Sequence, residues 1–314
     1  MVFFLLGWVC IVVLVFVLFF TRDSEDSDRD DDREVDVTET RDREFVGAHQ
    51  DELFRLFNEY VFAPTMKGRE QFIGRSSEMA LPFSRYYREH SFSVPAAPIK
   101  VVGTNVLEVS KDPLVLAIEQ VWVDAEGRLF GTTHYFDGQG WKLDWESYAP
   151  YSEMSWARFL ADLGGQGGEF RLLVRKRKSR DESKRFVLSF YRPPVFTEPE
   201  KEFLKSESPE VEVETDSELG KEFLRLWSEF NDGKFPLDSM LSNLDPEGFM
   251  RITVRMGLEE SELRGLKRVV LKEIIGPGWF GGFIREKHEA DKARLVPEVE
   301  AGEGDDKAER GENL

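Results

Sequence analysis

Four short strand-forming runs follow one another between residues 99 and 147. They read IKVVGTNVLEV (99–109), PLVLAIEQVWVD (113–124), RLFGTTHYFDG (128–138) and GWKLDWES (140–147). Each run is rich in the β-branched and aromatic residues typical of strands. The residues between them, at 111–113, 125–127 and 137–140, contain the Asp, Pro and Gly of tight turns. Because strands joined by tight turns are antiparallel, this stretch predicts a four-stranded meander.

Helices are predicted before the meander. Residues 50–62 place Leu53, Phe54, Phe57 and Val61 on one helical stripe. Pro64 should end that helix. A second helical region is predicted over residues 68–90, with breaks near Ser76 and Pro82. Helices followed by a meander indicate an α+β fold in which a curved sheet packs on a helix.

A resemblance to a known family rests on two segments, GREQFIGRSSEMALPFSRYYREH (68–90) and DGQGWKLDWESY (137–148). The matching residues are Arg69, Glu78, Pro82, Tyr86, Tyr87, Trp141, Asp144, Trp145 and Glu146. These segments resemble uncharacterised bacterial proteins with a short N-terminal membrane anchor, and the element order resembles nuclear transport factor two-like (cystatin-resembling) domains. The resemblance covers residues 49–163 and implies a cone-like domain there. It implies a fold and no reaction, because the family has no assigned reaction.

A second α+β unit is predicted over residues 169–285. A short helix at 151–163 and the glycine cluster at 164–168 separate it from the meander. Two strands at 169–178 and 184–192 are then followed by a long acidic loop at 197–215. An amphipathic helix at 216–230 and two strands, at 249–258 and 266–275, complete a ββαββ order.

The N-terminus predicts a membrane anchor. Residues 2–20, VFFLLGWVCIVVLVFVLFF, contain no charged residue, and a helix of this length is about 28 Å long, close to the bilayer's hydrocarbon thickness. A basic start and a small-residue cleavage site, which mark a signal peptide, are missing. We therefore expect residues 1–20 to be an uncleaved single span with the lipid bilayer as its partner. Arg22, Arg29 and Arg33 favour a cytoplasmic soluble part, and the extracytoplasmic side stays open.

The net charge of −18 belongs mainly to two acidic appendages. Residues 21–44 contain 12 acidic and 5 basic residues, and residues 286–314 contain 10 acidic and 5 basic residues. Such segments bury too little apolar surface to fold, so we expect a disordered stalk at 21–48 and a disordered tail at 286–314. The acidic balance argues against nucleic acid as a partner. A single cysteine excludes a disulfide framework and a cysteine-ligated metal site within the chain.

The familiar motifs of catalysis are missing from the sequence. It has no GxxxxGK[ST] phosphate loop, no G-x-S-x-G nucleophile turn and no HExxH, so no cofactor or metal is expected. Of the four histidines, His134 lies within a predicted strand, where it could act as a general base with Asp144 as its orienting carboxylate. The alternative interpretation is a structural histidine without a chemical role.

Three further features allow a structural or a binding interpretation. Trp141 and Trp145 are expected to fill the core between the sheet and the helices. Basic residues in a predicted hairpin turn would contact anionic lipid headgroups or simply be solvated; they are Arg175, Lys176, Arg177, Lys178 and Arg180. Trp279, Phe280 and Phe283 would contact a protein partner or clamp the chain end onto its own core.

Two functions from different classes follow. The first is a membrane-anchored, non-catalytic binding or assembly module that receives a protein partner or a small ligand. The second is a small cavity enzyme, an isomerase or a hydrolase, that uses His134 and Asp144. An open cavity in which both side chains converge would favour the enzyme, and a cavity filled by aromatic side chains would favour the module.

Overall fold

A computed structural model describes residues 32–89, 99–161, 167–178, 184–194, 200–260 and 267–295. The chain is a mixed α+β protein with a curved, nearly closed sheet, as the sequence predicts at the level of fold class. The described residues from Val46 to Leu295 belong to one compact unit. The predicted anchor at 2–20 lies outside the described residues. Within those residues, no helix has both the length and the apolar character needed to cross a bilayer.

The first helices differ from expectation at two places. Helix α2 spans Asp32–Phe62, so residues 32–48 of the expected disordered stalk are helical instead. Ion pairs one helical turn apart, such as that between Glu39 and Arg43 at 2.8 Å, stabilise such a charged helix. Helix α3 spans Met66–Glu70, and α4 spans Ser76–Glu89. The expected break near Ser76 is present, but α4 continues through Pro82.

The first sheet confirms the predicted meander. Strands β1 (Lys100–Lys111), β2 (Leu114–Val123), β3 (Leu129–Phe136) and β4 (Trp141–Leu143) pair as antiparallel neighbours in that order. Residues Trp145–Tyr148 are a short helix, α5, so the expected strand alternation ends at Leu143. Trp141 and Trp145 are nonetheless buried, as predicted. The indole of Trp145 packs on the rings of Phe83 and Tyr86 of α4.

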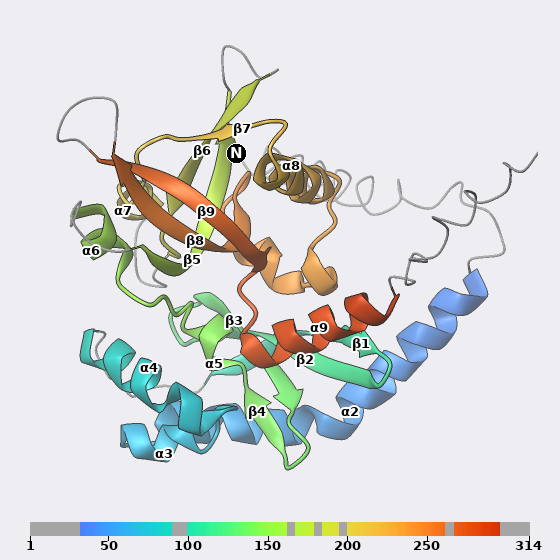
Figure 1. The fold of residues 1–314 in the computed structure, drawn as a ribbon. Coiled ribbons are helices and arrows are strands. Elements are labelled where there is room, and N and C mark those ends of the chain that lie inside the picture. The colour runs from blue at the N-terminus through green and yellow to red at the C-terminus, as the bar shows by residue number, and fades with distance from the viewer. Residues whose placement is uncertain are drawn as a thin grey trace, which may run out of the picture. The chain divides into compact units, whose positions relative to one another are not determined.

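The two faces of this sheet pack against different ends of the chain. On one face, Trp122 and His134 contact Phe57 of α2. On the other face, Tyr135 stacks on Phe283, with ring centroids 4.2 Å apart. Phe283 belongs to helix α9 (Gly282–Leu295), which lies beside β1 and β2 in Figure 1. The expected tail at 286–314 is therefore helical up to Leu295, because buried Ile284 fixes the helix on the sheet.

The second sheet has five strands, one more than expected. The strands are β5 (Gly168–Arg177), β6 (Arg185–Tyr191), β7 (Val211–Glu214), β8 (Met250–Glu260) and β9 (Lys267–Pro277), in the order β7-β6-β5-β8-β9. The predicted loop at 197–215 is wrong in part, because it includes α7 (Glu200–Leu204) and β7. The side chains of Val211 and Val213 are buried, which gives β7 a reason to pair with β6.

Helix α8 (Glu218–Asn231) contacts both edge strands, β7 and β9, which also contact one another, so the second sheet is nearly closed. Phe223 and Leu226 of α8 point into its apolar interior. Short helix α6 (Trp156–Ala161) contributes Trp156 and Phe159 to the same core. Two 3-10 turns, η1 (Pro236–Asp238) and η2 (Met240–Leu244), connect α8 to β8. The division into separate domains at 49–163 and 169–285 stays a prediction.

Candidate functional site

A cleft of about 360 Å³ lies among α8, η1, the ends of β8 and β9, and α9. Its apolar lining consists of Leu226, Phe230, Phe235, Pro236, Leu237, Met250, Ile275, Pro277, Phe280 and Ile284. Its charged and titratable lining consists of Arg225, Glu229, Lys234, Arg251, Arg285, His288, Glu289 and Lys292. An apolar interior with a few polar groups is typical of small-molecule sites, and the volume lies within their usual range of roughly 300–1,000 Å³.

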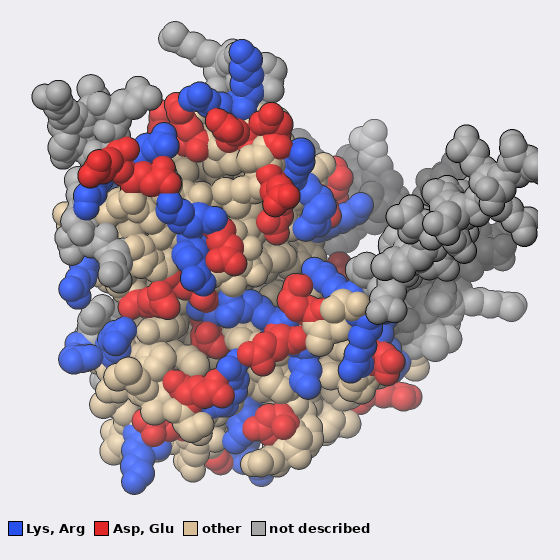
Figure 2. Space-filling model, in the orientation of Figure 1, with Lys and Arg blue, Asp and Glu red and all other residues tan. Residues whose placement is uncertain are grey.

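The cleft is more basic than the chain that carries it. Five of its lining side chains are Lys or Arg and two are Glu, whereas the whole chain has a net charge of −18. Arg225 and Lys292 form exposed ion pairs with Glu229 and Glu289. On the face seen in Figure 2, basic and acidic side chains alternate, without a large area of one sign.

One wall of the cleft has a strained backbone. Leu237 lines the cleft with φ +55°, and the next residue, Asp238, has φ +54°. A left-handed backbone conformation costs a residue other than glycine on the order of 1 kcal/mol or more, and here two consecutive residues adopt it. The conformation is held from the first sheet, because Asn105 donates to the Asp238 carbonyl at 3.0 Å and Glu119 accepts from the Ser239 hydroxyl at 2.5 Å. Such strain is common in walls of binding sites.

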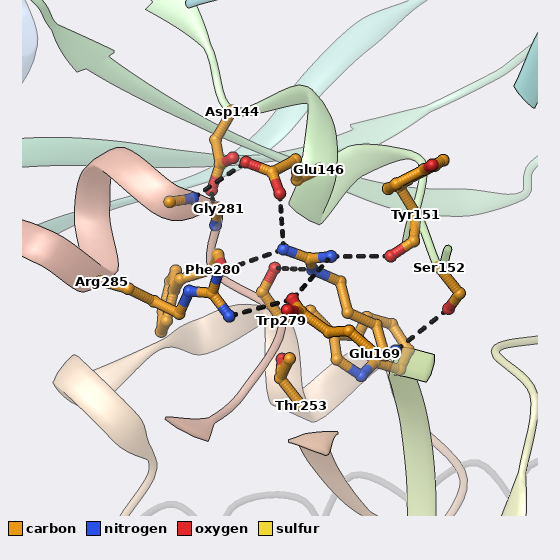
Figure 3. A network of polar contacts seen from close by, with 12 residues as sticks. Asp144, Glu146, Tyr151, Ser152, Glu169, Thr253, Trp279, Phe280, Gly281 and Arg285 are labelled. Atoms are coloured by element: carbon orange, nitrogen blue, oxygen red, sulfur yellow. Dashed lines mark hydrogen bonds and ion pairs between the residues drawn. The ribbon is translucent and has the colours of Figure 1, made fainter. Parts of the chain in front are cut away.

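A buried network around Arg171, drawn in Figure 3, contacts the backbone of the cleft residue Phe280. The Arg171 guanidinium donates to Glu146 at 2.9 Å and to the Tyr151 carbonyl at 2.7 Å. It also donates to the carbonyl of Trp279 at 3.2 Å, next to cleft residue Phe280. This side chain is 1 % exposed, so its contacts fix β5, α5 and the segment before α9 together.

Two carboxylates of α5 and its N-terminal flank hold the start of α9. Asp144 accepts from the Gly281 N–H at 2.8 Å, and Glu146 accepts from the Gly282 N–H at 2.9 Å; Figure 3 shows the first contact. Burial, together with the negative charge of Glu146, raises the pKa of Asp144 to about 7. Burial opposes ionisation of Glu146 as well, but the Arg171 charge keeps the net pKa of Glu146 below its usual value.

The structure does not bring His134 and Asp144 together as a catalytic pair. His134 is fully buried against Phe57, and its pKa is lowered to about 3 because burial disfavours the charged ring. Neither ring nitrogen has a hydrogen-bond partner that meets normal geometry. Asp144 instead contacts Gly281. A neutral, enclosed imidazole without its orienting carboxylate lacks the arrangement of a general base.

The other predicted site residues are mostly held by neighbouring side chains. Trp279 and Phe280 are buried and Phe283 is half-buried, so these rings clamp the chain end onto its core and are not exposed anchors.

The basic residues of β5 also have neighbouring partners. Arg177 pairs with Glu207, and the Arg175 guanidinium lies over the Phe249 ring at 5.6 Å. Arg177 thus belongs to the sheet and not to a free basic turn, because β5 extends to it. Lys176 lies on the same strand, and Lys178 directly follows its last residue. Arg180 lies outside the described residues.

Sequence reasoning missed the cleft. Its lining comes from α8, the η1 turn, two strand ends and α9, which are separated by up to 67 positions between Arg225 and Lys292. The run Lys234-Phe235-Pro236, a cation and a ring directly after an amphipathic helix, was the one local signal. Comparison of the chain with protein-family models, curated proteins and solved structures found no match.

Proposed function

We propose that this chain is a single-pass membrane-anchored binding module, without catalytic activity of its own, whose ligand site is the cleft beside α8 and α9. The anchor is residues 2–20, supported by their uninterrupted apolar character. The soluble part faces the cytoplasm, supported by Arg22, Arg29 and Arg33 directly after the anchor.

The observation that carries this function is the cleft itself. Its apolar walls include the half-buried rings of Phe230 and Phe235. The backbone strain at Leu237 has a purpose if that side chain must face a ligand. A ligand that fits about 360 Å³ is a small molecule or a single inserted side chain.

We also propose that the first helices and the meander, within residues 49–163, form a nuclear transport factor two-like domain. Helices α2 to α4 and the meander β1–β4 correspond in order to a nuclear transport factor two-like domain. In such a cone the enclosed space lies between helix and sheet, where this chain places Phe57, Trp122 and His134. Because side chains fill that space, we propose that the ligand binds instead in the cleft beside α9.

We propose a secondary role in membrane binding for the basic residues at the end of β5. Arg175, Lys176 and Lys178 lie near one end of the second sheet, where their charges would add to the attraction of anionic lipid headgroups. The enzyme alternative is disfavoured by the separation of His134 from Asp144.

The test uses the full chain in phosphatidylcholine nanodiscs and a decanol that carries a photoreactive diazirine. Light-induced adducts, located by peptide mass spectrometry, should lie at the cleft. Ile275→Trp should fill the cleft and remove them, whereas Val270→Trp, on the same strand but outside the cleft lining, should keep them. Thermal unfolding would verify that both variants fold. Adducts spread evenly over the chain, or unchanged in Ile275→Trp, would contradict the proposal.

A further inference from the structure

The Lys and Arg side chains that line the cleft differ in how they are paired with acidic side chains. Arg251 is fixed by Asp245 at 2.6 Å, and Arg285 is fixed by Glu169 at 3.1 Å. Both cations are therefore largely neutralised by partners. Arg225 and Lys292 have acidic partners on their own helices, in exposed pairs that stabilise little and exchange easily.

Lys234 has a different position. It follows α8 directly, its backbone N–H donates to the Glu229 carbonyl at 2.8 Å, and its side chain is exposed at the cleft. Among the residues that the structure describes, no acidic side chain is paired with the Lys234 ammonium. The backbone contact places Lys234 directly after α8, so a positive charge without an acidic partner in the described chain lies at a cleft that Phe230 and Phe235 also line.

We propose that the cleft binds a small amphipathic monoanion, such as a medium-chain carboxylate. The anionic group pairs with Lys234, and the apolar part lies on Phe230, Ile275 and Ile284. Charge complementarity selects the sign of the ligand, because Lys234 is the lining cation without an acidic partner in the described chain. Burial of methylene groups against the apolar walls, at about 0.8 kcal/mol for each, supplies the remaining affinity. This inference rests on the proposed function of the cleft.

The size of the cleft favours one such molecule over a macromolecular partner. About 360 Å³ is at the small end of ligand sites. A protein interface would need on the order of 800 Å² on this side alone. The lining combines buried apolar side chains with exposed charged ones, which matches a ligand with one apolar and one charged end. The buried ones are Leu226, Phe280 and Ile284, and the exposed ones include Arg225, Lys234 and Lys292.

The experiment extends the labelling of the full chain in phosphatidylcholine nanodiscs with a diazirine-bearing decanoate. Unlabelled decanoate should compete with cleft labelling at concentrations about tenfold lower than decanol or decylammonium does. Lys234→Gln should raise the decanoate concentration needed for half-competition about tenfold and leave decanol competition unchanged. Lys221→Gln, an exposed lysine of α8 outside the cleft lining, is the matched control and should change neither.

The outcomes separate the two proposals. Cleft labelling that decanoate and decanol suppress equally would overturn the anion inference while the binding function stands. The same holds if Lys234→Gln and Lys221→Gln behave alike. Failure of every probe, neutral or charged, to label the cleft would overturn the binding function together with this inference. Because Lys234 is exposed, its variant should unfold at the wild-type temperature, which a thermal scan verifies.

Discussion

The carboxylate of Asp144 accepts a hydrogen bond from the backbone N–H of Gly281, 137 positions later in the chain, at 2.8 Å. This contact connects the end of the first sheet to the segment that enters α9. Because Phe280 lies next to Gly281 and lines the cleft, the geometry of the candidate site depends on it.

We expect Gly281→Ala to destabilise the fold by about 2–4 kcal/mol. An added Cβ would lie 2.1 Å from Asp144 Oδ1 and 2.9 Å from Glu146 Oε2, so one buried and one half-buried carboxylate would have to move. The measurement is thermal unfolding of the full chain in detergent micelles. Gly276→Ala is the control, because its Cβ would meet Arg285 Cδ at an ordinary 3.8 Å. Equal midpoints for the two variants would contradict the predicted close approach.

Arg171→Met should cost about 3–5 kcal/mol, because it removes a buried cation and leaves the half-buried carboxylate of Glu146 without its ion-pair partner. Adding Glu146→Gln should recover part of the loss, since the unpaired charge is then removed. Arg185→Gln, which breaks the exposed pair with Glu212, should cost less than about 1 kcal/mol. A double-mutant cycle on Arg171 and Glu146 measures the coupling directly, and a coupling near zero would refute the buried network.

Asp144 should make stability fall as pH rises from about 4 to 7. Its pKa is raised to about 7 in the folded chain, from an ordinary value of 3.8, so the folded state holds a proton that the unfolded chain loses. Its favourable contribution is complete below the unfolded pKa and is lost as pH passes the folded one. The full span is worth on the order of 4 kcal/mol.

The test is the difference in unfolding free energy between wild type and Asp144→Asn, measured from pH 5 to pH 8. The wild type should lose stability relative to the variant as pH rises, with the change complete above about pH 7. The variant lacks the titrating group while its side-chain oxygen can still accept from the Gly281 N–H. A difference that is constant across this range would show that Asp144 does not titrate there.

His134 should react with diethyl pyrocarbonate far more slowly than His288 in the native chain. His134 is fully buried, and a half-exposed ring at His288 is open to the reagent. After unfolding, the two should react at similar rates. Peptide mass spectrometry over time gives both rates in one experiment, and rapid modification of native His134 would reopen the enzyme interpretation.

The sequence predicted the meander because its strands carry their own signals. The alternation in residues 99–147 and the turns that contain Asp and Gly fix order and direction without help from distant residues. The amphipathic stripe of α8, with Phe223 and Leu226 buried, was equally local. The packing of Trp145 also followed from its type, although its backbone is helical and not extended.

The missed elements depend on contacts with distant residues. Strand β7 shows the alternation VEVE over 211–214, a signal that was present but was masked by the acidic composition around it. Helix α9 looked like a charged tail, since its packing depends on Ile284 and on Asp291, which accepts from Ser110 and from the Asp112 N–H. Neither partner is recognisable from the helix sequence alone.

The candidate site was the least predictable part, for the same reason. Arg171 looked like one member of a strand with many basic residues, and only the folded chain shows that it is buried against Glu146. The pairing of Asp144 with a backbone N–H, instead of with His134, follows from the return of α9 to the first sheet.

The return of α9 to β1 also has a consequence for how the chain is made. The face of the first sheet that carries Leu107, Val109 and Tyr135 is covered by Phe280 and Ile284, which leave the ribosome more than a hundred residues later. At a synthesis rate of about 5–20 residues per second, that apolar face stays uncovered for several seconds or longer, until these residues have been synthesised. Nascent chains halted before Gly278 should therefore recruit chaperones through this face, and chains released after Leu295 should not.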